Sequence, residues 1–254
     1  VLSHDESDFT KNKQPSNQVT NLADKTKGGP RRWERTHTLK GRLATSTFQG
    51  YVMDSITVPL KNAYNSWMRT SSLAFFPDGR LAVGTLPGDI WIVSGINGKL
   101  DKITWQRFAA GLYEPLGMKV VDGVLTAITR GRLVKLHDYN KDGEADFYEA
   151  FFNEDEPDKG WHAYNFDLEV GKDGSFYYGR TGGFSQWSVP GGVVKVSADG
   201  KTSTVIGAGL RVPNGIGKLP DGRITLGDNQ GTYVPASKIS ITSQDAFHGA
   251  GSWN

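Results

Sequence analysis

The chain contains 254 residues, is 37% hydrophobic and carries a formal net charge of +2. A chain of this size can bury a substantial core, and so small a charge, without a stripe of Lys and Arg, argues against a nucleic-acid partner. The sequence contains no cysteine, which excludes disulfides, thiolate catalysis, cysteine-ligated zinc and covalently attached c-type haem on this chain. No apolar run approaches the roughly 20 residues of a membrane-spanning helix.

The N-terminal part of the chain is polar. Residues 1–30 show no apolar periodicity, so we expect a flexible segment or a strap over a neighbouring surface, followed by one folded domain over residues 31–254. Apolar and polar residues alternate over residues 51–60, which predicts a strand. We expect residues 40–66 to contribute part of a repeat unit.

Four of the six Asp-Gly pairs in the chain recur at a regular spacing, each between two apolar runs. They begin at Asp78, Asp122, Asp173 and Asp221, and are 44, 51 and 48 residues apart. The runs beside them are four to six residues long and rich in Val, Ile, Phe and Tyr, which predicts strands, and helical periodicity is absent. A period in this range built from short strands indicates a β-propeller. The predicted fold class is therefore all-β, with four-stranded antiparallel blades.

The predicted strands fall into four groups. They are residues 72–76, 81–84, 90–93 and 105–109 in the first blade, 117–121, 124–128, 132–136 and 147–152 in the second, 165–170, 175–178, 193–197 and 202–206 in the third, and 214–219, 223–226 and 238–241 in the fourth. A closed propeller of six such blades needs roughly 290 residues. We therefore expect four to five blades of a six-bladed propeller, completed by a longer chain or by another chain.

Residues 138–149 match the twelve-residue calcium loop. Oxygen-bearing side chains occupy loop positions 1, 3, 5, 9 and 12, a glycine occupies position 6, and position 7 can offer its backbone carbonyl. The predicted Ca²⁺ ligands are Asp138, Asn140, Asp142, Glu144, Asp146 and Glu149. The alternative is a solvated acidic hairpin. Because the loop joins two predicted strands and no helices flank it, we expect a structural ion on the face of the propeller that carries the Asp-Gly turns.

The opposite face gathers the candidates for chemistry. In a propeller, the loops that enter each innermost strand and those that leave each second strand surround the central channel, a common ligand site. These loops supply Arg69, Glu114, Arg130, Trp161, His162, Tyr164, Arg180, Arg211, Asn214, Asp228, Asn229 and Gln230.

Several of these side chains have specific candidate roles. His162 is the predicted general base, because imidazole titrates near neutral pH, although it could instead be a structural histidine beside Trp161. The arginines could clamp a carboxylate or form ion pairs that order loops. Asn229 could bind a ligand or belong to a turn, and Glu114 with Asp228 could form a glycosidase pair. The motifs of nucleophile elbows, P-loops, dinucleotide folds and zinc proteases are absent.

Six segments carry a family resemblance: residues 66–69 (SWMR), 76–80 (FPDGR), 88–94 (GDIWIVS), 136–138 (LHD), 209–215 (GLRVPNG) and 228–231 (DNQG). They resemble the PVC-type membrane-bound dehydrogenase propeller domains common in planctomycetes. More distantly, they are similar to the soluble PQQ-dependent glucose and sorbosone dehydrogenases. The resemblance spans roughly residues 50–240.

The resemblance implies a six-bladed propeller, often fused to a c-type cytochrome domain. In the quinoprotein relatives a histidine takes the substrate hydroxyl proton while hydride passes to PQQ, and calcium assists the quinone. His162 falls where that base lies and Arg211 where an arginine contacts PQQ, and Arg180, Asn214 and Asn229 are further cofactor candidates. The relatives' Arg-Asn pair, however, reads Arg211-Val212 here.

The predicted function is a PQQ-dependent sugar or alcohol dehydrogenase of the bacterial periplasm or exterior, which passes electrons to a cytochrome on another domain or chain. One alternative is a non-catalytic, calcium-stabilised propeller that binds carbohydrate or scaffolds a protein complex. Another is a carbohydrate-active hydrolase or lyase on the same fold.

Overall fold

The computed structural model describes residues 22–45, 50–154, 164–182, 191–231 and 235–250. Within these ranges the chain is built from strands, preceded by one 3-10 helix, η2 (Leu22–Thr26). None of the helical structure described there is long and apolar enough to cross a membrane.

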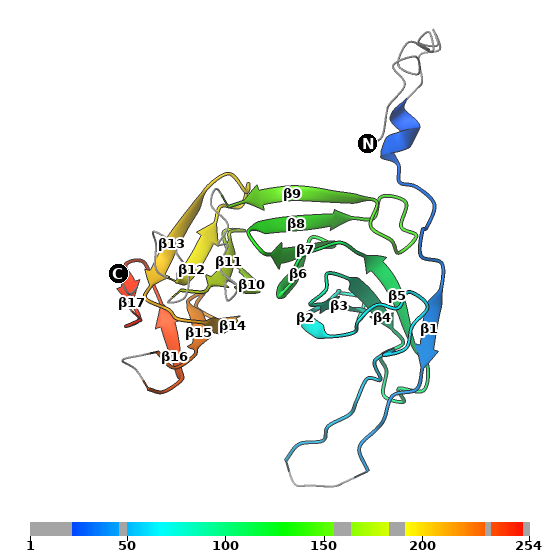
Figure 1. The fold of residues 1–254 in the computed structure, drawn as a ribbon, viewed down its shortest axis with the longest axis horizontal. Helices are drawn as coiled ribbons and strands as arrows, with labels where there is room; N and C mark the ends of the chain where they lie inside the picture. The colour runs from blue at the N-terminus through cyan, green and yellow to red at the C-terminus, as the bar shows by residue number, and fades with distance from the viewer. Residues whose placement is uncertain (1–21, 46–49, 155–163, 183–190, 232–234, 251–254) are drawn as a thin grey trace, which may run out of the picture.

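The strands form four antiparallel sheets, which are the blades of a propeller arranged in an arc (Figure 1). Blade 1 contains β2 (Thr70–Phe75), β3 (Leu81–Thr85), β4 (Ile90–Ser94) and β5 (Ile103–Ala109), with β1 (Thr36–Leu39) added outside β5. Blade 2 contains β6 (Gly117–Val121), β7 (Val124–Thr129), β8 (Arg132–His137) and β9 (Phe147–Asn153).

The other two blades follow the same meander. Blade 3 contains β10 (Asn165–Val170), β11 (Phe176–Arg180), β12 (Gly192–Val196) and β13 (Ser203–Ala208), with the short β17 (Ala246–Phe247) pairing parallel to β13. Blade 4 contains β14 (Pro213–Lys218), β15 (Ile224–Asp228) and β16 (Lys238–Thr242). The predicted all-β propeller is confirmed, and the strands predicted for the four blades agree with the observed ones to within two residues.

The Asp-Gly pairs form the turns between the first and second strands of each blade. The glycines take left-handed backbone angles, with φ between 79° and 99°, a region that only glycine enters at little cost. In three of the turns the aspartate carboxylate accepts a hydrogen bond from the backbone amide two residues later, at Arg80, Ser175 and Arg223. The repeat found in the sequence is therefore a repeated turn with one hydrogen-bond pattern.

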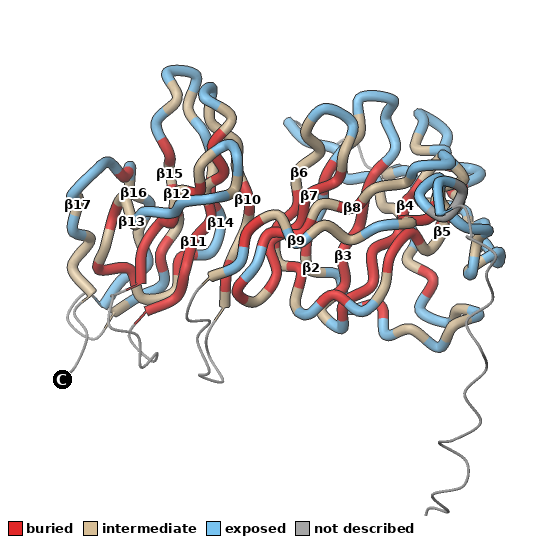
Figure 2. Tube along the Cα trace, turned by 90° about the horizontal axis from the view of Figure 1, so that it is seen from above, coloured by how far each residue is buried: buried red, intermediate tan, exposed pale blue. Residues whose placement is uncertain are grey.

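Apolar side chains pack between successive blades, and Figure 2 shows the buried residues along the strands and the exposed ones at the turns. One cluster joins blades 1 and 2, around Phe108 and Leu125, and the next joins blades 2 and 3, around Leu133 and Tyr178. A third, around Leu226, joins blades 3 and 4. The innermost strands β2, β6, β10 and β14 lie next to one another in this order, so each blade offers one edge to the channel.

The expected partial blade in residues 40–66 is wrong. No strand forms over residues 51–60, and in the described part of this segment only one isolated bridge, Arg42 to Ser55, pairs the backbone. Instead the segment lays Ile56, Val58 and Tyr64 against the outer face of blade 1. Their alternating apolar pattern reflects burial on a sheet face rather than pairing within a sheet.

Candidate functional site

The two faces of the arc divide the loops as the sequence predicts. On the turn face, a cavity of about 690 Å³ is lined by the β2–β3 turn, the β6–β7 turn and the β8–β9 loop that contains Asp138. On the other face open the described loops that enter the innermost strands. The predicted calcium loop therefore lies on the face opposite Arg180, Arg211, Asn214 and Asn229, the predicted cofactor residues that the structure describes.

The channel has a cavity of about 380 Å³ to which the innermost strand of every blade contributes: Thr70, Gly117, Asp167 and Asn214 are among its lining residues. Gly117 is required here, because a Cβ atom at this position would lie 2.2 Å from the Asp167 backbone. The Pro115 carbonyl accepts hydrogen bonds from the hydroxyl groups of two β2 serines at 2.7 and 2.8 Å, which ties blade 1 to blade 2.

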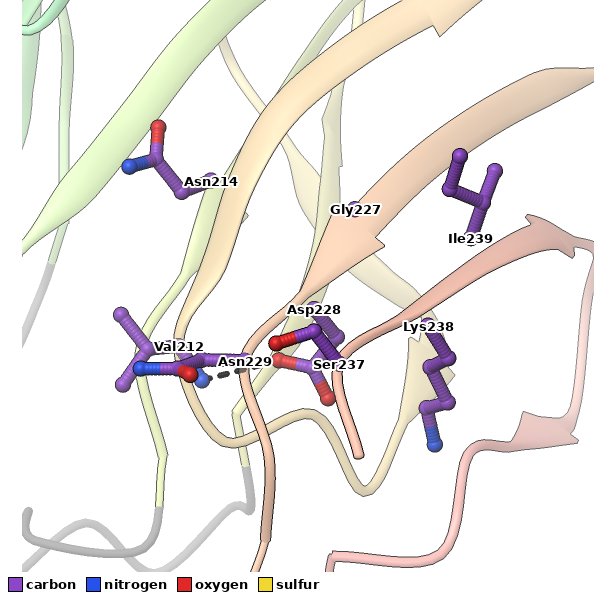
Figure 3. Close-up of a pocket in the computed structure, with 8 residues that line it drawn as sticks. All are labelled: Val212, Asn214, Gly227, Asp228, Asn229, Ser237, Lys238 and Ile239. Carbon is purple, nitrogen blue, oxygen red and sulfur yellow. Dashed lines mark hydrogen bonds between the residues drawn. The ribbon is translucent and has the colours of Figure 1, made fainter. Parts of the chain in front are cut away.

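A second cavity, of about 390 Å³, lies at the end of blade 4 and includes Asn214, Asn229 and Lys238 (Figure 3). Because Asn214 lines both cavities, this one adjoins the channel. Its floor is fixed by Asp228, which is buried and accepts hydrogen bonds from the backbone amides of Arg211 (3.2 Å) and Val212 (2.9 Å).

Two of the predicted cofactor residues, Asn214 and Asn229, line this cavity, and a third, Arg211, is joined to its floor through the Asp228 carboxylate. The Arg211 guanidinium donates to the Gln230 carbonyl at 2.8 Å, and the backbone amide of Asn229 donates to the Val212 carbonyl at 3.3 Å. Guanidinium and carboxamide groups are the donors that suit a carboxylate-bearing ligand. The cofactor-binding roles of these residues stay predictions.

Arg180 lies at the end of β11 in blade 3, buried, on the same face. It stands beside Tyr178, whose hydroxyl donates to the Glu154 carboxylate and whose pKa burial raises far above its usual value. Arg180 does not line the blade 4 cavity. Tyr164 donates its backbone amide to the Thr181 hydroxyl at 3.0 Å.

His162, the predicted general base, and Trp161 lie outside the described residues. The prediction that His162 is the base therefore stays a prediction. The suggested carboxylate pair finds no support, because Asp228 is engaged by two backbone amides and stands in blade 4, whereas Glu114 enters blade 2.

Glu114 lies in the loop that enters β6 on this face, and the sequence did not predict its backbone conformation. Its backbone is left-handed, with φ at 52°, and its carboxylate lies 3.9 Å from the Arg130 guanidinium. Arg130 also donates to the Tyr113 hydroxyl at 3.2 Å. Burial raises the pKa of the Glu114 carboxyl, and the charge of Arg130 opposes that shift.

The loop of residues 138–149 has the hydrogen bonds of a tight acidic turn. The Asp138 carboxylate accepts from the amides of Asp142 (3.1 Å) and Gly143 (2.9 Å), and the Asn140 side chain accepts from the same Asp142 amide at 3.0 Å. Lys141 and Gly143 are left-handed, with φ at 60° and 87°. The oxygens of positions 1 and 3 are thereby turned toward the inside of the loop.

The remaining predicted ligands have other partners. Asp146 accepts from the Tyr139 amide at 2.8 Å, and Glu149 lies on β9, where it contacts the His137 ring at 2.7 Å. The buried Glu144 carboxylate is held by Arg32. In the described part of the chain, no group of three or more His, Cys, Asp or Glu side chains is arranged to hold a metal ion.

Residues 28–33 form a strap over this loop, whereas residues 1–21 of the predicted flexible segment or strap lie outside the described residues. Arg32 bonds Glu144 through its backbone amide at 2.7 Å and its side chain at 2.6 Å, and Gly29 donates to Asp146 at 2.8 Å. The Trp33 ring is sandwiched between the guanidinium groups of Arg32 and Arg107, at 4.7 and 4.8 Å. Only the fold brings these distant residues together, so the sequence offered no signal for them.

No family model and no curated protein matches the chain. Among solved structures, it is similar to the PQQ-bound form of aldose sugar dehydrogenase from Streptomyces coelicolor, with a TM-score of 0.57 and 15% identity over 83% of this chain and 65% of that one. It is also similar to the apo form of the soluble aldose sugar dehydrogenase from Escherichia coli (TM-score 0.53, 11% identity, 83% and 64% of the chains) and to the PQQ domain of pyranose dehydrogenase from Coprinopsis cinerea (0.51, 12%, 63% and 44%).

These likenesses show the propeller fold. The chain spans about two thirds of the length of the two aldose sugar dehydrogenases and less than half of the length of the Coprinopsis structure.

Proposed function

We propose that the chain is the propeller of a quinoprotein-type dehydrogenase that uses PQQ to oxidise an aldose or a related alcohol. The observation that carries the proposal is the blade 4 cavity beside the channel, lined by Asn214 and Asn229 and joined to Arg211 through Asp228, on a fold shared with a PQQ-bound sugar dehydrogenase. Sugar sites combine amide and charged hydrogen-bonding groups with aromatic surfaces, and the channel face offers both.

The donor set fits PQQ, which is a planar quinone with three carboxylates. Arg211 would bind a carboxylate through its guanidinium, Asn214 and Asn229 would donate from their amides, and Arg180 would add positive charge. When bound, PQQ would supply the two-electron oxidising power. His162 would take the proton from the sugar hydroxyl, and the channel walls would orient the sugar.

The electrons would leave to a c-type cytochrome on another domain or chain, and further blades would close the ring, from the same or another chain. Support for a partner at the ends of the arc comes from the exposed apolar side chains there, Leu73 and Phe75 on β2 and Ile239 and Ile241 on β16. A periplasmic or extracellular location agrees with the absence of cysteine.

We also propose that the 138–149 loop binds Ca²⁺ as a structural ion. Asp138, Asn140 and Asp142 fit, because their oxygens already face the inside of a loop with left-handed residues at positions 4 and 6. Glu149 does not fit in this conformation, because it contacts His137 on β9. The ion would therefore take the Glu144 carbonyl, Asp146 and water in place of a bidentate Glu149.

A non-catalytic propeller that binds carbohydrate or scaffolds a complex is the alternative. It is favoured by Val212, which puts an apolar side chain in the blade 4 cavity where the quinoprotein relatives have a polar one. Such a protein would bind sugar without oxidising it.

The test is to add PQQ and Ca²⁺ to the purified chain and follow quinone absorbance and dye-linked oxidation across an aldose panel. His162→Ala should lower turnover by about 10²–10⁴-fold while PQQ still binds. His37→Ala, on the outer strand β1, is the matched control and should leave turnover unchanged. Sugar binding without turnover in the wild type would support the non-catalytic alternative instead.

A further inference from the structure

The ion pair of Glu114 is the longest in the described part of the chain. Lys119–Glu169, Lys195–Asp173 and Arg32–Glu144 all close to hydrogen-bond distance, at 2.7, 2.9 and 2.6 Å. The Arg130–Glu114 pair stays at 3.9 Å, which is too long for a hydrogen bond. A carboxylate kept to order a loop would be expected to close that distance.

The carboxylate of Glu114 is also left without a hydrogen bond. Its Oε2 atom is buried and has no hydrogen-bond partner among the described residues, and the whole side chain is 15% exposed. Leaving a buried charged acceptor unsatisfied is costly, so such groups mark places where a partner is to be supplied.

The backbone at this position is strained as well. Glu114 has φ at 52°, a left-handed conformation that is unfavourable for a residue with a Cβ atom. A glycine would avoid this cost, and six other non-glycine residues of the described chain, among them Asp122 in an Asp-Gly turn, also have positive φ. Strained conformations of this kind gather at functional sites.

Glu114 lies close to the channel along the chain. Glu114 precedes Leu116 and Gly117, which line the channel cavity. Beside it stand Tyr113, which is 59% exposed, and Arg130, whose guanidinium lies 5.6 Å from the Tyr113 ring. An acceptor, a donor and an exposed aromatic face together suit a neutral ligand with several hydroxyl groups.

We propose that Tyr113, Glu114 and Arg130 form a sugar-contacting wall at the mouth of the channel, where the Glu114 carboxylate accepts hydrogen bonds from hydroxyl groups of an aldose. This inference rests on the proposed function, which it deepens by naming a specificity-determining residue. Arg130 donates to the same sugar, and the Tyr113 ring packs on its C–H face.

The experiment measures binding of D-glucose, D-galactose and D-xylose to the purified chain by calorimetry, without PQQ. Glu114→Gln should weaken the tightest of these complexes by about tenfold or more, because a charged acceptor is lost. Glu169→Gln is the matched control, since its side chain has the same 15% exposure and also pairs with a cation, and it should change binding by less than twofold.

Glu114→Gly separates a functional from a structural role. It relieves the left-handed strain, so it should raise the Tm by about 2–4 °C while weakening sugar binding at least as much as Glu114→Gln. A lower Tm would identify Glu114 as a structural residue and overturn the inference.

The outcomes also separate the two proposals. If the wild type binds an aldose and Glu114→Gln binds it equally well, the inference fails and the proposed function stands. If the wild type binds none of the three sugars, both fail.

Discussion

At the residue scale, the aspartate of an Asp-Gly turn can both close the turn by accepting a backbone hydrogen bond and pair with a lysine. In the β10–β11 turn, Asp173 accepts hydrogen bonds from the Ser175 amide and hydroxyl at 3.1 Å and from Lys195 at 2.9 Å. The hydrogen bond from Lys195, followed by that from the Ser175 amide, lowers the pKa of Asp173 to about 2. The turn that the sequence marks as a repeat is thus also an acid-sensitive contact.

Asp173→Asn should therefore lower stability at pH 7, by less than about 1 kcal/mol because the pair is exposed. The folded pKa of about 2 lies below the ordinary 3.8, so the carboxylate's contribution is complete above pH 4 and disappears as the pH falls toward 2. Urea unfolding at pH 7, 4 and 3 should show the gap between wild type and variant closing only below pH 4. A gap that stays constant to pH 3, or that survives in a Lys195→Met background, would contradict this account.

The sequence predicted these residues well because the signal is local. An aspartate that accepts from the amide two residues on, followed by a left-handed glycine, needs only neighbouring residues. Glu114 had no such signal, since no turn motif in the neighbouring sequence marks a left-handed glutamate and its nearest cation, Arg130, is distant in the sequence. The long-range contacts of Arg32 and Glu144 were unpredictable for the same reason.

At the scale of elements, the strap and the β8–β9 loop behave as one unit. Gly28 lies so close to Asp146 that a Cβ atom there would be 2.6 Å from the carboxylate, and the Asn140 amide donates to the Gly29 carbonyl at 2.7 Å. Two proposed calcium ligands therefore also hold the strap. Whatever orders the loop should order the strap with it.

Chelation should accordingly lower the Tm and expose the strap. We expect EGTA to reduce the Tm of calcium-loaded protein by several degrees, because a ligand that binds only the folded state stabilises it, and to speed tryptic cleavage at Lys27, Arg31 and Arg32. Asp142→Ala should show the low Tm and fast cleavage with or without EGTA. The control Asp221→Ala, in an exposed turn, should keep the full response to the chelator.

An EGTA response equal in wild type and Asp142→Ala would place any calcium elsewhere in the molecule. A wild type that does not respond would contradict the calcium proposal. Neither result would bear on the channel face, because the loop and the channel mouth lie on opposite faces of the arc.

At the scale of the whole molecule, the apolar faces between neighbouring blades are buried, whereas the outer face of blade 4 exposes apolar side chains. Between blades 3 and 4, Ile224 and Leu226 are 3% and 1% exposed, whereas on the outer side of blade 4 Ile239 is 87% exposed. Alternation along a strand predicts one buried face and one outer face, but it cannot say whether the outer face meets water or another blade. For that reason the sequence alone could not predict whether the ring is completed by a longer chain or by another chain.

The end face of blade 4 can be tested with one pair of substitutions. Ile224→Thr should destabilise the chain by about 2 kcal/mol or more, because it removes buried apolar surface and buries a hydroxyl. Ile239→Thr should leave the free energy of unfolding within about 0.5 kcal/mol of the wild type if that face meets only water, and sedimentation velocity should show less self-association because an exposed apolar side chain on an edge strand is removed. If Ile239→Thr proves as destabilising as Ile224→Thr, the face is covered in solution, and the stability of this arc depends on the blade or chain that covers it.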